Sequence, residues 1–153
     1  MMIFKQLIVS LLIASQVLQG SVMEEDKTYN MNTNPALLDI YLKALLEKES
    51  SGNYNAVHKP STIIDSVTGK PIKVQALGGY GILDINWYGT DTQKSWTEMA
   101  GLKGASIDDP KAQDDVARFF VQKYFDKYGS WDLVSVAWFA GPGSLSSRRR
   151  TSG

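Results

Sequence analysis

Residues 34–57 read NPALLDIYLKALLEKESSGNYNAV, and the rest of the expected fold is built around this stretch. Asn34 can accept hydrogen bonds from unpaired backbone amides and Pro35 suits the first helical position, so a helix is predicted to begin here. Apolar side chains then recur every three to four residues and mark one buried face: Leu38, Tyr41, Leu42 and Leu45. Charged side chains mark the opposite, solvated face: Asp39, Lys43 and Glu47.

Glu49 falls on the apolar stripe of this helix, whereas Glu47 continues the polar one. A carboxyl group held against apolar surface has its ionised form destabilised, so its pKa rises and it can carry a proton near neutral pH. The alternative is a frayed last turn that leaves Glu49 in water. The helical pattern taken alone favours neither interpretation.

The middle of the chain predicts a small β element and a glycine-rich loop. The stretch 62–74 contains two short β-branched runs around a turn at Gly69, which is typical of a hairpin. The loop 78–81 then leads into the start of a helix over 82–88. Its glycines lack the spacing of a nucleotide-binding loop, and we expect them to allow close approach of the backbone to a substrate.

The C-terminal third is predicted to be helical. Asp109 and Pro110 open one helix and Gly129 supplies its stop, while Ser130 can cap a second helix over 131–139. Three side chains of these helices are expected in the core: Phe119, Phe120 and Val134. The sequence therefore predicts an α+β fold that is mainly α, with a small β-hairpin element.

Composition excludes several classes of site. The 153 residues suffice for one domain with a single core. The absence of cysteine excludes disulfides, thiol nucleophiles and cysteine-ligated metals, and the single histidine, His58, excludes multi-histidine metal sites. No metal and no cofactor are expected. The stretch 22–147 holds 12 basic and 16 acidic residues, so it offers nucleic acid no basic face.

The N-terminus is typical of a targeting segment. Lys5 precedes an apolar stretch over 7–18, which is long enough for a signal peptide and shorter than the roughly 20 residues that span a bilayer. Gly20 and Ser21 offer a cleavage point, and an uncleaved anchor is the alternative. We expect four segments: a signal peptide or membrane anchor (1–21), a linker (22–33), the folded domain (34–143) and a flexible basic tail (144–153).

Three short motifs, in order, carry a family resemblance. The stretch 49–57, ESSGNYNAV, resembles the E-S-x-x-N-x-x-A-x motif of soluble-lytic-transglycosylase-like domains. The stretch 78–85, GGYGILDI, is similar to their G-A-x-G-L-M-Q-I loop, and 137–143, AWFAGPG, is similar to their A-Y-N-A-G-P-G. The resemblance covers roughly residues 34–143, and the order of the motifs makes it more specific than any one of them.

The resemblance implies a lysozyme-like fold and cleavage of the β-1,4 bond between N-acetylmuramic acid and N-acetylglucosamine in peptidoglycan. It implies Glu49 as the catalytic acid and five substrate-binding residues: Ser50, Tyr80, Gly81, Asp84 and Trp138. Further aromatic candidates for contact with sugar faces are Trp87, Tyr88 and Trp96. The implied partners are glycan strands and a cell-envelope machine for secretion, conjugation or phage entry. The implied location is the periplasm or cell envelope, or the virion of a phage.

Two positions depart from the family pattern and leave alternatives open. Asp84 stands where the family has glutamine, and Trp138-Phe139 replaces a tyrosine-asparagine pair whose hydroxyl positions the catalytic glutamate. An indole N–H from Trp138 could substitute for that hydroxyl. The alternatives to a transglycosylase are a lysozyme-type hydrolase that uses Asp84 as its second carboxylate, and a non-catalytic peptidoglycan-binding assembly protein.

Overall fold

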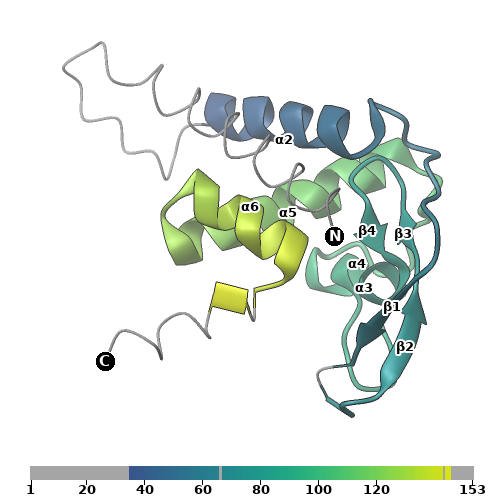
Figure 1. The fold of residues 1–153 in the computed structure, drawn as a ribbon. Helices are drawn as coiled ribbons and strands as arrows, with labels where there is room; N and C mark the ends of the chain where they lie inside the picture. The colour runs from purple at the N-terminus through teal and green to yellow at the C-terminus, as the bar shows by residue number, and fades with distance from the viewer. Residues whose placement is uncertain (1–34, 66, 143, 146–153) are drawn as a thin grey trace, which may run out of the picture. The chain divides into compact units, whose positions relative to one another are not determined.

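A computed structural model describes residues 35–65, 67–142 and 144–145 (Figure 1). The predicted signal segment, the linker, and the tail beyond residue 145 lie outside the described residues. The elements, in chain order, are α2 (Pro35–Ser50), β1 (Ser61–Ile64), β2 (Pro71–Val74), β3 (Ala76–Leu77), β4 (Ile82–Leu83), α3 (Asp84–Tyr88), α4 (Trp96–Met99), α5 (Pro110–Tyr128) and α6 (Trp131–Ala140). The prediction of an α+β fold that is mainly α is confirmed.

The chain groups into two compact units, and the long helices α2 and α5 contribute residues to both. Of the described residues, the first unit contains 35–44 and those from Phe120 onward, and the second contains those of Leu45–Phe119. Within the described residues, no helix combines the length and the apolar character needed to cross a bilayer.

The first unit has an aromatic core. The Tyr41 ring stacks on Trp131, with ring centroids 4.7 Å apart, and Trp131 also packs on Phe125 at 4.3 Å. Ser135 ties α6 to α2 because its Oγ lies 2.8 Å from the Tyr41 hydroxyl. The apolar stripe predicted for α2 is buried as expected, and so are the predicted core residues Phe120 and Val134.

The expected burial of Phe119 was wrong, since its side chain is 37% exposed. The buried stripe of α5 consists of neighbouring pairs one turn apart, namely Val116 and Ala117, Phe120 and Val121, and Tyr124 and Phe125, and Phe119 falls beside this stripe. Phe120 belongs to the stripe because it shares a face with two other buried residues, Val116 and Tyr124. Ser130 is the N-cap residue of α6 as predicted, but its side chain makes no capping hydrogen bond.

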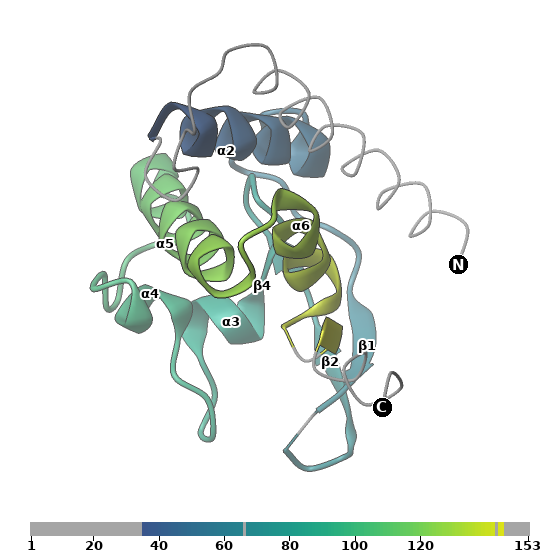
Figure 2. The ribbon, with the colours of Figure 1, turned by 90° about the vertical axis from the view of Figure 1, so that its left-hand side faces the viewer.

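The second unit contains the β structure (Figure 2). The predicted hairpin is present, with β1 and β2 antiparallel and Ser61 opposite Val74. A second, shorter hairpin was not predicted: β3 pairs with β4, with Leu77 opposite Ile82. The expected helix start over 82–88 is therefore correct only from Asp84 onward, because the first two residues pair as a strand. The short helices α3 and α4 pack against each other.

Candidate functional site

Glu49 lies in the last turn of α2, and the helix continues through Ser50. The alternative of a frayed last turn is thus contradicted. The helix ends because Ser51 takes a left-handed backbone conformation (φ 54°), while its amide still donates to the Glu47 carbonyl oxygen at 2.8 Å. Glu47 is exposed, whereas Glu49 is partly buried. The two carboxylates therefore differ in environment as their positions on the helix predict.

Burial raises the pKa of Glu49 from its usual 4.5 to about 7, and the neighbouring Lys48 ammonium opposes this rise only in part. Desolvation penalises the charged carboxylate more than the neutral acid, which is the physical cause of the shift. Among the described residues, no group hydrogen-bonds the buried Oε1 atom of Glu49. The site thus holds a carboxyl group that can carry a proton near neutral pH.

The other carboxyl oxygen of Glu49 packs against the backbone of Gly81. A Cβ atom built on Gly81 would lie 2.7 Å from Glu49 Oε2, and the residue has a φ of +62°. Both facts favour glycine: a side chain would collide with the carboxyl group, and the left-handed backbone is strained for other residues. Gly81 is therefore a wall of the Glu49 site.

The turn 78–81 connects β3 to β4, and its other glycines also face side chains at close range. A Cβ on Gly78 would lie 2.4 Å from Gln113 Oε1, and one on Gly79 would lie 2.4 Å from Leu46 Cδ1. We expected these glycines to allow approach of a substrate. The structure shows instead that the protein's own side chains, from α2 and α5, approach the turn.

Gln113, near the start of α5, is a residue that the sequence analysis missed. Its side chain is 1% exposed and its amide is fully engaged. Oε1 accepts from the Gly79 amide at 2.7 Å, and Nε2 donates to the carbonyl oxygens of Tyr54 and Ile107. The sequence did contain a signal for Gln113, of the same kind as for Glu49: a polar residue on an otherwise apolar helix face. On α5 that face carries Ala112, Val116 and Ala117.

Asp114, the next residue of α5, binds two tyrosines through one oxygen atom. The hydroxyls of Tyr54 and Tyr80 each donate to Asp114 Oδ1 at 2.7 Å, and the two rings meet edge to face. Burial, followed by the hydrogen bond to Asp114, raises the pKa of both phenols. Both tyrosines therefore stay protonated and act as hydrogen-bond donors.

The structure gives Tyr80 and Asp84 local partners. The Tyr80 side chain is 3% exposed, so its ring offers a sugar no free face in this conformation. Asp84 begins α3, and its Oδ1 accepts from the amides of Ile85 at 2.8 Å and Gln75 at 3.1 Å. A carboxylate at a helix N-terminus satisfies free amides there, which is a structural role.

The remaining predicted residues belong to several elements. The Ser50 hydroxyl donates to the Leu46 carbonyl oxygen at 3.2 Å, within α2. Trp138 is a partly buried residue of α6 in the first unit, whereas Glu49 and Gly81 belong to the second. Trp87 was a wrong candidate for sugar contact: it is fully buried, and its indole donates to the Ala105 carbonyl oxygen. Tyr88 is 61% exposed, and Trp96 is partly buried.

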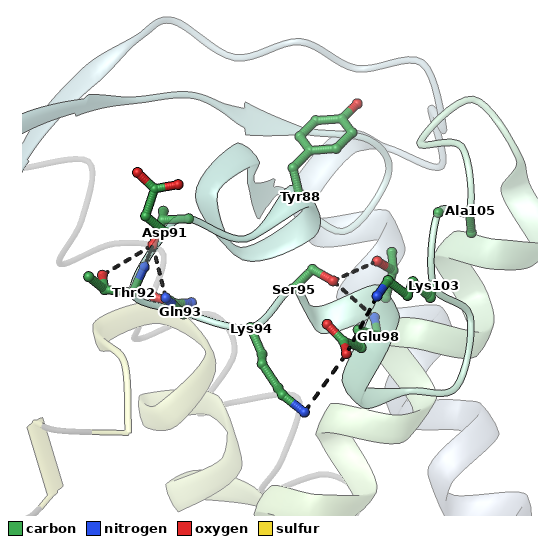
Figure 3. Close-up of a pocket in the computed structure, with 12 residues that line it drawn as sticks. Tyr88, Asp91, Thr92, Gln93, Lys94, Ser95, Glu98, Lys103 and Ala105 are labelled. Atoms are coloured by element: carbon green, nitrogen blue, oxygen red, sulfur yellow. Dashed lines mark hydrogen bonds and ion pairs between the residues drawn. The ribbon is translucent and has the colours of Figure 1, made fainter.

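A separate open pocket of about 550 Å³ lies around α3 and α4 (Figure 3). Tyr88 lies on one side of it, and the loop that contains Lys94 and Ser95 forms another. Lys94 and Lys103 both approach Glu98, with N–O distances of 3.8 and 3.9 Å. Glu49 does not line this pocket. No group of three or more histidine, aspartate or glutamate side chains in the described parts of the chain is arranged to hold a metal.

Comparisons with known proteins add no relative: no family model, curated protein or solved structure matches this chain.

Proposed function

We propose that this protein is a peptidoglycan lytic transglycosylase with a lysozyme-like fold, and that Glu49 is its single catalytic acid and base. The observation that carries the proposal is the state of Glu49: a carboxyl group at a helix end, packed on Gly81, with a pKa raised to about 7. A group with this pKa can both give and take a proton near neutral pH. The three motifs of the sequence supply the substrate class.

The chemistry needs one carboxyl group. Protonated Glu49 donates its proton to the glycosidic oxygen as the bond to the muramic-acid C1 breaks and positive charge develops on that sugar. The resulting carboxylate then takes the proton of the C6 hydroxyl of the same sugar. The C6 oxygen bonds to C1 and closes a 1,6-anhydro ring, so Glu49 regains its proton and no water is consumed.

A lysozyme-type hydrolase with Asp84 as second carboxylate is the runner-up. Asp84 Oδ1 already accepts two backbone amides at the start of α3, which favours a structural role for this residue over a catalytic one. A hydrolase would add water and leave a reducing end, whereas a transglycosylase leaves an anhydro end. A non-catalytic wall-binding protein would release nothing.

Mass analysis of muropeptides released from purified sacculi, in water enriched in oxygen-18, tests the proposal. We expect anhydro ends without the heavy isotope, and we expect Glu49→Gln to release none. Glu47→Gln is the matched control, since it removes the exposed carboxylate two residues away and should keep full activity. Products with labelled reducing ends, lost on Asp84→Asn, would establish the hydrolase; activity retained in Glu49→Gln would refute the proposal.

A further inference from the structure

Two consecutive residues of α5 connect the same two segments of the second unit. Gln113 bonds to the backbone of both segments: it donates to the Tyr54 carbonyl oxygen at 2.9 Å and accepts from the Gly79 amide at 2.7 Å. Asp114 bonds to side chains of the same segments, through the hydroxyls of Tyr54 and Tyr80. The segment at residue 54 and the turn 78–81 are thus each held by one backbone bond and one side-chain bond.

These two segments adjoin Glu49. Tyr54 follows Glu49 by five residues, just beyond the end of α2, and the turn 78–81 places Gly81 against the Glu49 carboxyl group. Tyr80 is the chain neighbour of Gly81, so a displacement of the Tyr80 side chain would move the backbone that covers Glu49. Because Gln113 is buried and Asp114 accepts two short hydrogen bonds, their positions leave the turn little freedom.

We propose that Gln113 and Asp114 form a clamp that positions the 78–81 turn over Glu49 and keeps water away from its carboxyl group. Both are positioning residues, since neither contacts Glu49 in the hydrogen bonds described above. This inference rests on the proposed function in one respect: the proposed function assigns Glu49 as the catalytic acid, and the clamp keeps that acid protonated. It assigns the buried Tyr80 a positioning task, which differs from the substrate contact implied by the sequence motif.

Several charged or titratable groups of the described residues bear on the site. Lys48, on the same helix as Glu49, lowers the pKa of the carboxyl group, and Tyr54, Tyr80 and Asp114 belong to the clamp. Removal of Asp114 also removes a negative charge, which by itself would lower the pKa of a nearby acid. A variant that changes no charge is therefore needed, and Tyr80→Phe supplies it, because it deletes one hydroxyl and keeps the ring.

The test is the pKa of Glu49 in the full chain, followed by NMR on protein labelled with carbon-13 in the glutamate carboxyl groups. The sequence contains five glutamates, and the Glu49 signal is the one that disappears in Glu49→Gln. We expect titration near 7 in the native chain. Asp114→Ala and Tyr80→Phe should each lower that value by about one pH unit or more, as water reaches the carboxylate.

Conservative and control variants complete the design. Asp114→Asn keeps an acceptor oxygen and should recover part of the shift. Asp115→Asn removes the adjacent carboxylate, which pairs with exposed Lys111, and should leave the pKa of Glu49 within a few tenths of a unit of the native value. If Asp114→Ala does not fold, the pKa of Glu49 in Tyr80→Phe and Tyr54→Phe tests the clamp, since each of these variants removes only one hydroxyl group.

The readout separates this inference from the proposed function. A pKa of Glu49 that stays near 7 in folded Asp114→Ala and Tyr80→Phe would overturn the clamp, even if the native chain releases anhydro products. A pKa that falls in both variants supports the clamp, even if sacculi yield no product. In an active enzyme, the basic limb of the pH–rate profile should move to lower pH in Tyr80→Phe by the same amount as the pKa of Glu49.

Discussion

The burial of the Glu49 carboxyl group has a cost in stability. This group is desolvated, and Oε1 finds no hydrogen-bond partner among the described residues. Buried polar groups without partners destabilise a fold, and an ionised carboxylate does so most. Packing alone would favour an apolar side chain on this face of α2, whereas the proposed transglycosylase chemistry requires a carboxyl group that holds a proton near neutral pH.

The first prediction concerns the pH dependence of folding. The pKa of Glu49 rises from 4.5 to about 7 on folding. Between pH 4.5 and pH 7 the folded chain therefore holds a proton on Glu49 that the unfolded chain has lost. Ionisation of Glu49 therefore lowers the free energy of unfolding as pH rises through this range. The total loss reaches about 3 kcal/mol above pH 7. Glu49→Gln should thus be more stable than the native chain at pH 8 and similar to it at pH 4.

Urea denaturation at both pH values measures this difference. Glu47→Gln is the control, because the exposed Glu47 carboxylate should give a difference that hardly changes with pH. A Glu49→Gln variant that is less stable than the native chain at pH 8 would contradict the assignment of a desolvated acid.

The second prediction concerns Gly81, which has a positive φ and lies against the Glu49 carboxyl group. Gly69 has a similar φ, +68° against +62°, but a Cβ there would meet nothing within 4 Å. Both substitutions to alanine carry the same backbone strain, of about 1 kcal/mol. Only Gly81→Ala should also displace Glu49, so we expect it to be more destabilising by a further 1–3 kcal/mol or so, and to abolish lysis.

Thermal unfolding and sacculus digestion of both variants check this expectation. Equal losses of stability in Gly81→Ala and Gly69→Ala, with activity kept in both, would show that the position of the Glu49 carboxyl group does not depend on its contact with Gly81.

At the scale of elements, the first turns of α5 organise the surroundings of α2's last turn. Gln113 accepts one hydrogen bond and donates two, so all three of its interactions require an amide side chain. Its contacts reach Tyr54, Ile107 and Gly79, which lie in three different loops of the second unit. The helix thus holds these loops by one buried side chain.

The third prediction uses this asymmetry of donors and acceptors. Gln113→Glu keeps the shape but places an oxygen against two carbonyl oxygens, and it buries a charge. We expect a loss of about 3 kcal/mol or more in the free energy of unfolding at pH 8, and a smaller loss at pH 4, where the acid can be protonated and donate.

Gln122→Glu is the control on the same helix. The Gln122 amide donates to Asp126 in an exposed setting, so its replacement should cost less than about 1 kcal/mol. Similar losses for the two variants at pH 8 would indicate that the Gln113 amide is not the organising group of these loops.

At the scale of the whole molecule, the chain combines an apolar N-terminal stretch with a mildly acidic body. The apolar stretch is typical of an exported protein, and the acidic body does not favour nucleic acid as a partner. Both agree with the proposed peptidoglycan substrate. The segment itself lies outside the described residues, so its role stays a prediction from the sequence.

The fourth prediction is that residues 1 to about 20 direct the chain across the inner membrane. Leu12→Arg places a charge in the middle of the apolar stretch and should retain the protein in the cytoplasm. Met23→Arg adds the same charge beyond the stretch and should leave export intact. Cell fractionation with N-terminal sequencing measures both, and a native chain found in the cytoplasm with an uncut N-terminus would contradict the prediction.

Helix α2, the β1–β2 hairpin, α5 and α6 were predictable from sequence because their patterns are local. A helical repeat, a proline at the first position and a glycine after the last are all properties of neighbouring residues. The position of Glu49 on the buried face of α2 follows from the same repeat. The same repeat distinguishes Phe120, which is one turn from Val116 and Tyr124, from the exposed Phe119, so the expected burial of both phenylalanines was an error in the use of a local pattern.

The surroundings of Glu49 required the folded chain. Gly81 lies 32 positions after Glu49, and Asp114 lies 34 positions after Tyr80, so no local pattern indicates these contacts. The strand pairing of Ile82 with Leu77 likewise overrode a stretch that looked helical. Local periodicity could therefore propose an acid on a buried face, but only long-range packing brings together the glycine turn and the two residues of α5 that enclose it, because such contacts depend on where distant segments meet.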